Sequence, residues 1–201
     1  MGLRRFAASI EGVTEFIWNR YVEEAEIVAA IGPRPKDLSK EDEWRKKEGM
    51  LRLYLNGGTE PVLPGRNIRS SMIQGADASA LRHKHGKTQR ALGPFLRRGL
   101  VVKPLWIPFK DVTVTLHRDI VRIPPRTGPT VVKYWPKADQ WSLDFELEVY
   151  DDSLQGESEL FASLEAAGIF CGIGTGRPDY GKFAVTKWEE LPLEKAAGAK
   201  K

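Results

Sequence analysis

The sequence predicts an α+β domain whose core elements follow the order strand, helix, strand, strand, helix, strand. Residues 141–150 alternate between apolar and polar side chains, as expected for a strand with one buried and one acidic face. Apolar residues recur at helical spacing in two separate stretches, 67–81 and 155–167. Extended stretches flank both helices. This is the split βαβ, or ferredoxin-like, order with an antiparallel sheet.

The first strand and a helical insertion precede the first core helix. Residues 3–12 alternate imperfectly and predict the strand, which continues into a turn or short extended piece at 13–20. Residues 21–31 are typical of a helix, which Gly32-Pro-Arg-Pro35 ends. A second helix, at 40–55, begins after the preferred N-cap Ser39 and ends at Asn56-Gly57-Gly58.

The remaining elements complete the predicted core and add a β-hairpin. They are an extended stretch at 61–65, the helix at 67–81, a basic loop that becomes extended over 101–109, strands at 112–116, 119–123, 130–135 and 141–150 with a turn at 124–129, the helix at 155–167, a glycine-rich loop and a last strand at 183–188. We expect one domain over 1–193, with insertions at about 21–60 and 82–137, and a frayed tail at 194–201.

Composition excludes several classes of protein. A chain of 201 residues, 41% of them hydrophobic, is long enough to bury a core. It contains no apolar window of about 18 residues and no signal peptide, so we expect a cytoplasmic protein without a membrane partner. The single cysteine, Cys171, excludes an intrachain disulfide framework and fits a reducing compartment. We expect no cofactor.

The positive charge is concentrated in one segment. Net charge is only +4, but the chain has no Asp or Glu from Ala78 to Lys110. The basic side chains of this segment include Arg82, Lys84, Lys87, Arg90, Arg97, Arg98 and Lys103. Such a one-sided segment is typical of a surface that binds a polyanion, although an ordinary solvated basic face has the same pattern.

Three motifs stand in order along the chain. They are Ile10-Glu-Gly-Val-Thr-Glu-Phe-Ile17, Pro61-Val-Leu-Pro-Gly-Arg-Asn-Ile-Arg-Ser-Ser-Met72 and Gly172-Ile-Gly-Thr-Gly-Arg-Pro-Asp-Tyr-Gly-Lys-Phe-Ala-Val185. The first resembles the first strand of the RAMP proteins, which are the RRM-like RNA-binding subunits of CRISPR effector complexes. The second resembles the motif that opens the first RAMP helix, and the third resembles the glycine-rich RAMP signature before the last strand. The chain looks most similar to compact RAMP-like proteins of phages and mobile elements.

The resemblance implies a non-catalytic subunit that coats a single strand, RNA or possibly DNA. It implies binding to the sugar–phosphate backbone without base specificity, and partners that include copies of the chain along the strand and other effector-complex subunits. The resemblance also implies that a hairpin in the second insertion acts as a "thumb". Its candidate contacts to the strand are Arg126 and Lys133.

The first turn of the helix at 67–81 and the glycine-rich loop are the main candidate sites. Free N–H groups and the helix dipole favour a phosphate at such a turn, although a plain surface helix cap has the same residues. In the loop, the glycines either approach the ligand or let the helix pack against the sheet. We expect the cations of the loop to share one groove with those of the helix. The candidates are Arg66, Asn67, Arg69 and Ser70 at the helix and Gly174, Gly176, Arg177 and Lys182 in the loop.

Further candidates follow the first strand and lie in the basic segment. After the strand, Arg20 and Asn19 are candidates for phosphate contacts, and Trp18 either stacks on a base or anchors the core. In the basic segment, the candidates are Arg82, Lys84, Lys87 and Arg90.

Two alternatives belong to other functional classes. His83 or His85 could act as the general base of a metal-independent ribonuclease, or lie in a flexible basic loop; no third ligand nearby supports a metal site. Residues 11–20 contain no Asp, so the cleavage route of target-cleaving RAMP subunits is not supported. The second alternative is a protein-interaction module of a phage replication or recombination system.

Overall fold

The computed structural model describes residues 3–85, 87–122, 126–150 and 157–192. The predicted tail at 194–201 and the start of the predicted turn at 124–125 lie outside the described residues. The core is a four-stranded antiparallel sheet in the order β12-β1-β11-β7. Its strands are β1 (Leu3–Gly12), β7 (Leu100–Lys103), β11 (Ser142–Tyr150) and β12 (Phe183–Leu191). This order confirms the predicted ferredoxin-like core.

Strand register places the apolar residues of β1 and β11 on one face of the sheet. Phe6 lies opposite Leu147 and Ile10 lies opposite Leu143, and all four side chains are fully buried. The opposite face carries the acidic residues predicted for β11, which form ion pairs with neighbouring strands. An example is the bond from Arg5 to a Glu146 carboxylate oxygen at 2.7 Å. The period-two alternation of this strand therefore predicted both of its faces correctly.

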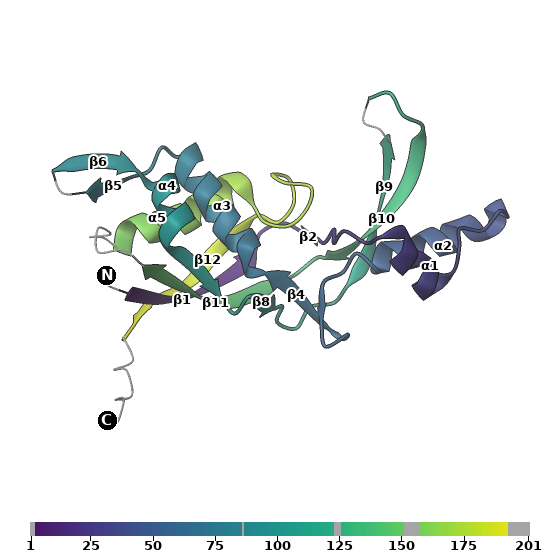
Figure 1. Ribbon diagram of the computed structural model, residues 1–201, viewed down its shortest axis with the longest axis horizontal. Helices are drawn as coiled ribbons and strands as arrows, with labels where there is room; N and C mark the ends of the chain where they lie inside the picture. Colours follow the sequence, from purple (N-terminus) through teal and green to yellow (C-terminus); the bar gives the residue numbers. More distant parts are fainter. Residues whose placement is uncertain (1–2, 86, 123–125, 151–156, 193–201) are drawn as a thin grey trace.

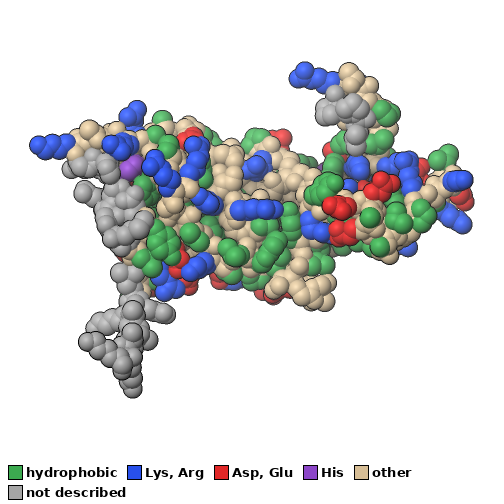
Figure 2. All heavy atoms as spheres, in the orientation of Figure 1, with side chains coloured by type: hydrophobic (Ala, Val, Ile, Leu, Met, Phe, Trp, Pro, Cys, Tyr) green, Lys and Arg blue, Asp and Glu red, His purple; other side chains and the backbone are tan. Residues whose placement is uncertain are grey.

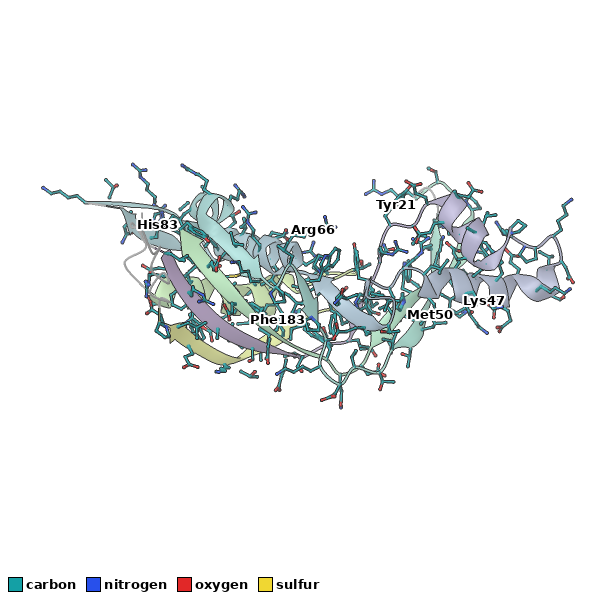
Figure 3. All side chains as sticks on the ribbon, turned by 60° about the horizontal axis from the view of Figure 1, so that its bottom comes forward. Tyr21, Lys47, Met50, Arg66, His83 and Phe183 are labelled. Carbon is teal, nitrogen blue, oxygen red and sulfur yellow. The ribbon has the colours of Figure 1, made fainter. Side chains whose placement is uncertain are left out.

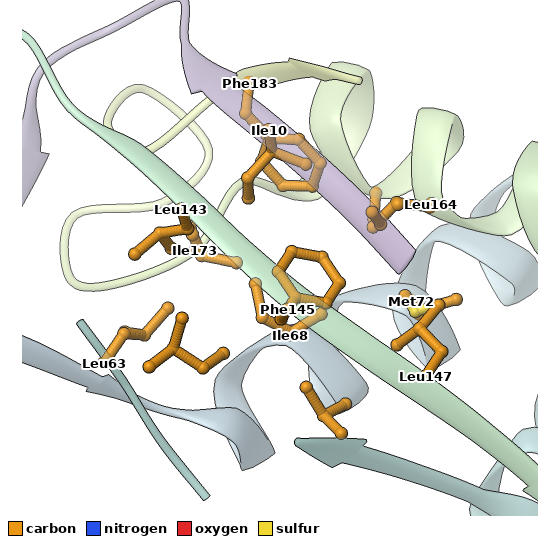
Figure 4. Packing of buried hydrophobic residues seen from close by; sticks show 14 of the residues in the cluster. Ile10, Leu63, Ile68, Met72, Leu143, Phe145, Leu147, Leu164, Ile173 and Phe183 are labelled. Carbon is orange, nitrogen blue, oxygen red and sulfur yellow. The ribbon is translucent and has the colours of Figure 1, made fainter. Parts of the chain in front are cut away.

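The helices α3 (Gly65–Ala78) and α5 (Glu157–Ala166) cover the buried face of the sheet (Figure 1). A short π-helical turn, η1 (Ala167–Cys171), extends α5. Ile68 and Met72 of α3 meet residues of β11 and Leu164 of α5 in the core (Figure 4). A Cβ at Gly75 would lie 2.5 Å from the amide nitrogen of Ala167, so α3 and η1 pack closely there only because this residue is glycine.

The basic segment folds differently from the prediction. It forms a hairpin of β5 (Arg82–His85) and β6 (Thr88–Ala91), and then the helix α4 (Leu92–Gly99), where we predicted a loop leading into an extended stretch. Leu92, Phe95 and Leu96 of α4 are buried in the core because helical spacing brings them to one side of α4. The next strand, β7, belongs to the core sheet, so the insertion predicted at 82–137 is interrupted by a core strand.

A second group of elements forms what we call the lobe, at the end of the molecule opposite to the β5–β6 hairpin (Figure 1). It consists of β2 (Phe16–Ile17), α1 (Glu24–Ile31), α2 (Leu38–Met50), β9 (Thr115–Arg122) and β10 (Thr130–Ala138). Strands β2, β10 and β9 form a sheet, and the tip of the β9–β10 hairpin projects from it. Helix α2 is fastened to β10: the Tyr134 hydroxyl donates to Asp42 at 2.6 Å, and Arg45 donates to the Val132 carbonyl at 2.8 Å.

A small sheet links the core and the lobe. It contains β3 (Leu55–Asn56), β4 (Glu60–Pro64) and β8 (Trp106–Pro108). Helix α2 ends at Met50, five residues before the predicted end at Leu55, because the chain turns into this sheet. Within the described residues, no helix is both long enough and apolar enough to cross a bilayer.

Candidate nucleic-acid interface

A backbone hydrogen bond fixes the first residue of helix α3, and the residue after it is exposed at the surface. The N–H of Gly65 donates to the Leu105 carbonyl at 2.8 Å, and Gly65 itself is buried. The preceding residue, Pro64, provides no side-chain cap, and the first turn contains no acidic residue. Arg66 is exposed on this turn (Figure 3). The positive end of the helix dipole therefore lies beside a guanidinium group, which favours an anion at this point.

A hollow of about 360 Å³ lies along the exposed side of α3. Its lining residues are Arg66, Arg69, Ser70, Ile73, Gln74 and Arg97. The Arg69 guanidinium of α3 donates to the Arg97 carbonyl of α4, and the Arg97 guanidinium pairs with Asp77 of α3 at 3.1 Å, so each helix holds one cation of the other in place. Asn67 is different, because its side-chain amide donates to the Pro64 carbonyl at 3.3 Å and completes the helix start.

The glycine-rich loop between η1 and β12 is folded tightly against β2. Gly174 and Gly181 have φ angles of +83° and +72°, which are strained for residues with a side chain. A Cβ at Gly174 would lie 2.8 Å from the Ile17 carbonyl oxygen, and one at Gly181 would overlap the carbonyl of Ile173. The loop also donates backbone hydrogen bonds from Thr175 to Ile17 at 3.0 Å and from Gly181 to Glu15 at 2.8 Å. Packing therefore accounts for these glycines, as in the alternative we kept open.

A second hollow, of about 530 Å³, lies between the loop and α3. Its lining residues are Gln74, Phe170, Cys171, Gly174, Thr175, Gly176, Arg177 and Pro178. The Arg177 side chain is exposed. Burial raises the pKa of the Cys171 thiol, and the nearby positive charge of Arg177 lowers it to a smaller extent.

Gln74 lines both hollows, so the two adjoin. The Ser71 hydroxyl, buried beneath them, donates to the Gly172 carbonyl at 2.7 Å and ties α3 to the loop. Together the two hollows form what we call the groove. Among the described residues that line it, none carries a carboxylate. Lys and Arg side chains lie over α3 and α4, whereas acidic and basic side chains are mixed over the lobe (Figure 2).

The structure brings together most of the predicted helix and loop residues, but not all of them. Arg66, Arg69 and Arg177 line the groove. Lys182 lines neither hollow: its N–H donates to the Thr14 hydroxyl at 3.0 Å, at the start of β12. Sequence reasoning overlooked Gln74 and Phe170, and it counted Arg97 as part of the basic segment without placing it beside α3. Gln74 lies one helical turn after Ser70, and this spacing was a usable signal.

The segment after β1 is structural in large part. Trp18 was a wrong choice as a base-stacking residue, because its side chain is only 1% exposed and its ring packs edge-on against Phe16 at 4.7 Å. Arg20 donates to the Leu51 carbonyl at 3.0 Å and pairs with Glu26, which fastens this segment to the end of α2 and to α1. Asn19 is exposed and accepts a hydrogen bond from Arg52 at 3.4 Å.

The basic hairpin lies apart from the groove. Arg82, Lys87 and Arg90 are exposed on β5 and β6 or the turn between them. The backbones of Lys84 and His85 belong to β5, but their side chains lie outside the described part of the structure. His83 is 5% exposed, with its ring centroid 4.8 Å from that of Phe95 (Figure 3). A buried imidazole is poorly placed to take a proton from a ribose hydroxyl, so the structure does not support His83 as a general base.

The two predicted thumb residues have different environments. Arg126 is exposed near the tip of the β9–β10 hairpin. Lys133 lies against α2, where its ammonium group is 3.3 Å from Glu48, and Arg52 donates to the same carboxylate at 2.7 Å. Burial raises the pKa of Glu48, but the two cations outweigh it and the pKa is lowered overall. Lys133 therefore helps to hold the lobe together.

Over the described ranges, no three acidic, histidine or cysteine side chains gather closely enough to hold a metal ion.

Comparisons with known proteins identify the fold. No protein-family model matches the sequence, and no curated protein matches it. A chain in the cryo-EM structure of the type III-B Cmr-beta bound to cognate target RNA is similar, with a TM-score of 0.54 at 10% identity, over 94% of this chain and 61% of that chain. This chain therefore spans about three fifths of the length of that one.

A second solved structure is Cmr6 from Pyrococcus furiosus, with a TM-score of 0.45 at 10% identity over 91% of this chain and 98% of that chain. The chain therefore shares its fold with that Cmr-beta chain, and its core sheet has the ferredoxin-like strand order that the sequence predicted.

Proposed function

We propose that this chain binds single-stranded RNA in the groove and serves as a non-catalytic subunit of a ribonucleoprotein. One observation carries the proposal: Arg66 of α3 and Arg177 of the glycine-rich loop, far apart in the sequence, lie on hollows that adjoin at Gln74. The choice of RNA is supported by the fold, which is shared with a chain from a structure that contains target RNA.

The chemistry of the groove suits the sugar–phosphate backbone. Guanidinium groups bind phosphate oxygens through paired hydrogen bonds, and the start of α3 adds the positive end of its dipole. Arg69 is pre-oriented by its bond to the Arg97 carbonyl, so binding requires little further ordering of that side chain. Contacts of this kind position a strand without reading its sequence.

The proposal includes neighbours along the strand. We propose that the chain acts as a single domain beside further copies of itself or other effector subunits on the same RNA. The projecting β9–β10 hairpin is suited to contact such a neighbour, because its tip carries the exposed Arg126 and its strand β9 the 56% exposed Ile120.

A salt titration of RNA binding tests the proposal. The probe is a labelled oligouridylate, with oligothymidylate as the DNA comparison, and affinity is measured by filter binding at several salt concentrations. The double variant Arg66→Ala, Arg177→Ala removes two groove cations. Its log–log salt slope should become shallower by about 1.4, since each phosphate contact to a single strand contributes about 0.7.

The control variant is Lys40→Ala, Lys47→Ala, which makes the same change in net charge on exposed positions of α2. It should leave the slope near that of the wild type. Absence of salt-dependent binding by the wild type would refute RNA binding. Equal slopes for the two double variants would refute the groove as its site.

A further inference from the structure

Phe170 forms an aromatic wall of the second hollow. The residues that line the first hollow include no aromatic side chain. Its side chain is 57% exposed, although it lies beside the packed junction of α5, α3 and the last strand. Its neighbour Ile169 is 59% exposed but does not line the hollow. The ring is therefore accessible to a ligand that enters this cationic groove.

The backbone fixes Phe170 in this outward position. It belongs to η1, whose first residues, Ala167 and Gly168, are buried against α3 and β12. A Cβ at Gly168 would overlap the carbonyl of Phe183, so the turn fits against β12 only with glycine there. The N–H of Gly172 closes the π-helical turn on the Ala167 carbonyl at 2.8 Å. Turns of this kind are frequently found at functional sites, and here the turn aims one ring at the hollow.

Charge and shape define what the ring would contact. Arg177 lines the same hollow, and the Gln74 amide, which donates to the Ser70 hydroxyl at 3.0 Å, marks its boundary with the first hollow. The hollow thus offers a π-face and a cation within one space of about 530 Å³, a size typical of small-ligand sites. An unpaired nucleobase with its own phosphate has the matching pair of groups.

We propose that Phe170 stacks on one unpaired base of the bound strand while Arg177 holds an adjacent phosphate. This inference rests on the proposed function and adds a base contact to a site otherwise described by phosphate contacts. Stacking tolerates any base, because every base has a π-face. The groove therefore binds a strand of any sequence, with one base of that strand inserted in the second hollow.

Three variants and a crosslink test this inference. Phe170→Ala should weaken oligouridylate binding by at least about fivefold, while the salt slope stays unchanged because no cation is lost. Phe170→Trp should retain most of the affinity. Ile169→Ala, with the same exposed apolar loss one residue away, is the matched control and should bind like the wild type. Thermal melts of all three should match that of the wild type, since both side chains are largely exposed.

Photo-crosslinking locates the base directly. An oligouridylate carrying 5-iodouridine is irradiated on the wild-type protein, and the attachment site is mapped by peptide mass spectrometry. Attachment at Phe170 supports the inference. Attachment only elsewhere, or equal affinity of Phe170→Ala and Ile169→Ala, overturns it and leaves phosphate binding by Arg66 and Arg177 standing. Failure of the wild type to bind RNA at all overturns both proposals.

Discussion

Among the described glycines with a positive φ angle, Gly181 should be the one whose replacement by alanine destabilises the protein most. The new Cβ would overlap the Ile173 carbonyl, which is backbone and cannot move aside like a side chain. The conformation, at φ +72°, adds strain of about 1–2 kcal/mol. Relieving the overlap requires the loss of the Ile173–Gly181 and Gly181–Glu15 backbone hydrogen bonds, each contributing about 0.5–1.5 kcal/mol.

Together these effects cost about 2–5 kcal/mol, which lowers the midpoint of thermal unfolding by about 4–20 °C in a chain of this size. Gly57 provides the matched control: its φ is +60°, and an added Cβ would have nothing within 4 Å. Gly57→Ala carries the same strain, and the stiffer unfolded chain offsets about 0.4–1 kcal/mol of it in both variants. Gly57→Ala should therefore lose at most about 1.6 kcal/mol and melt above Gly181→Ala, because it keeps both backbone hydrogen bonds.

Circular dichroism or calorimetric melts of the two variants decide the question. If Gly181→Ala melts within about 2 °C of Gly57→Ala, the loop relaxes without loss, and the argument that packing requires its glycines is refuted.

Three other substitutions test the remaining assignments. Glu48→Gln should cost about 1–3 kcal/mol in urea unfolding at about pH 7, because Lys133 loses its partner. Since the folded-state pKa of Glu48 lies below its ordinary value of 4.5, its contribution is present above that pH and is lost as the pH falls; the variant's deficit should therefore shrink at about pH 4 and below. Trp18→Ala should lower the free energy of unfolding by about 3–5 kcal/mol; unchanged stability with weakened RNA binding would contradict its place in the core. Labelled RNA incubated with the wild-type protein should stay intact on denaturing gels. Cleavage by the wild type that disappears in the double variant His83→Ala, His85→Ala would restore the ribonuclease alternative.

The core fold was predictable because its signals are local. The alternation of β11 and the apolar spacing of α3 come from residues that bury one side of a regular element. Helix α4 was missed because Gly93 and Pro94 near its start are typical of loops, although Pro is tolerated in a first helical turn. The apolar spacing of Leu92, Phe95 and Leu96 was present in the sequence and outweighs those two residues.

The candidate site was harder to predict, because surface residues acquire their roles from distant segments. Arg66 and Arg177 could be chosen from motifs, but only the fold shows that Gln74 lies between them. Trp18 was ambiguous because a tryptophan after a strand fits a core and a stacking surface equally well, and its burial depends on Phe16 and on Phe109 of a distant segment. Phe170 was overlooked since its outward position depends on the π-helical turn rather than on any local pattern.

Two backbone hydrogen bonds from the glycine-rich loop, one to Ile17 of β2 and one to Glu15 just before it, have a mechanical consequence. Thr175 and Gly181 hold the carbonyls of Ile17 and Glu15, and β2 pairs with β10 of the projecting hairpin. Main-chain hydrogen bonds thus join the loop that carries Arg177 to the base of the hairpin, and we expect them to resist rotation of the hairpin relative to Arg177. Substitutions at the surface should change this joint little. On a strand shared by several copies of the chain, such a stiff joint would impose a constant repeat length, measured in nucleotides, from one copy to the next.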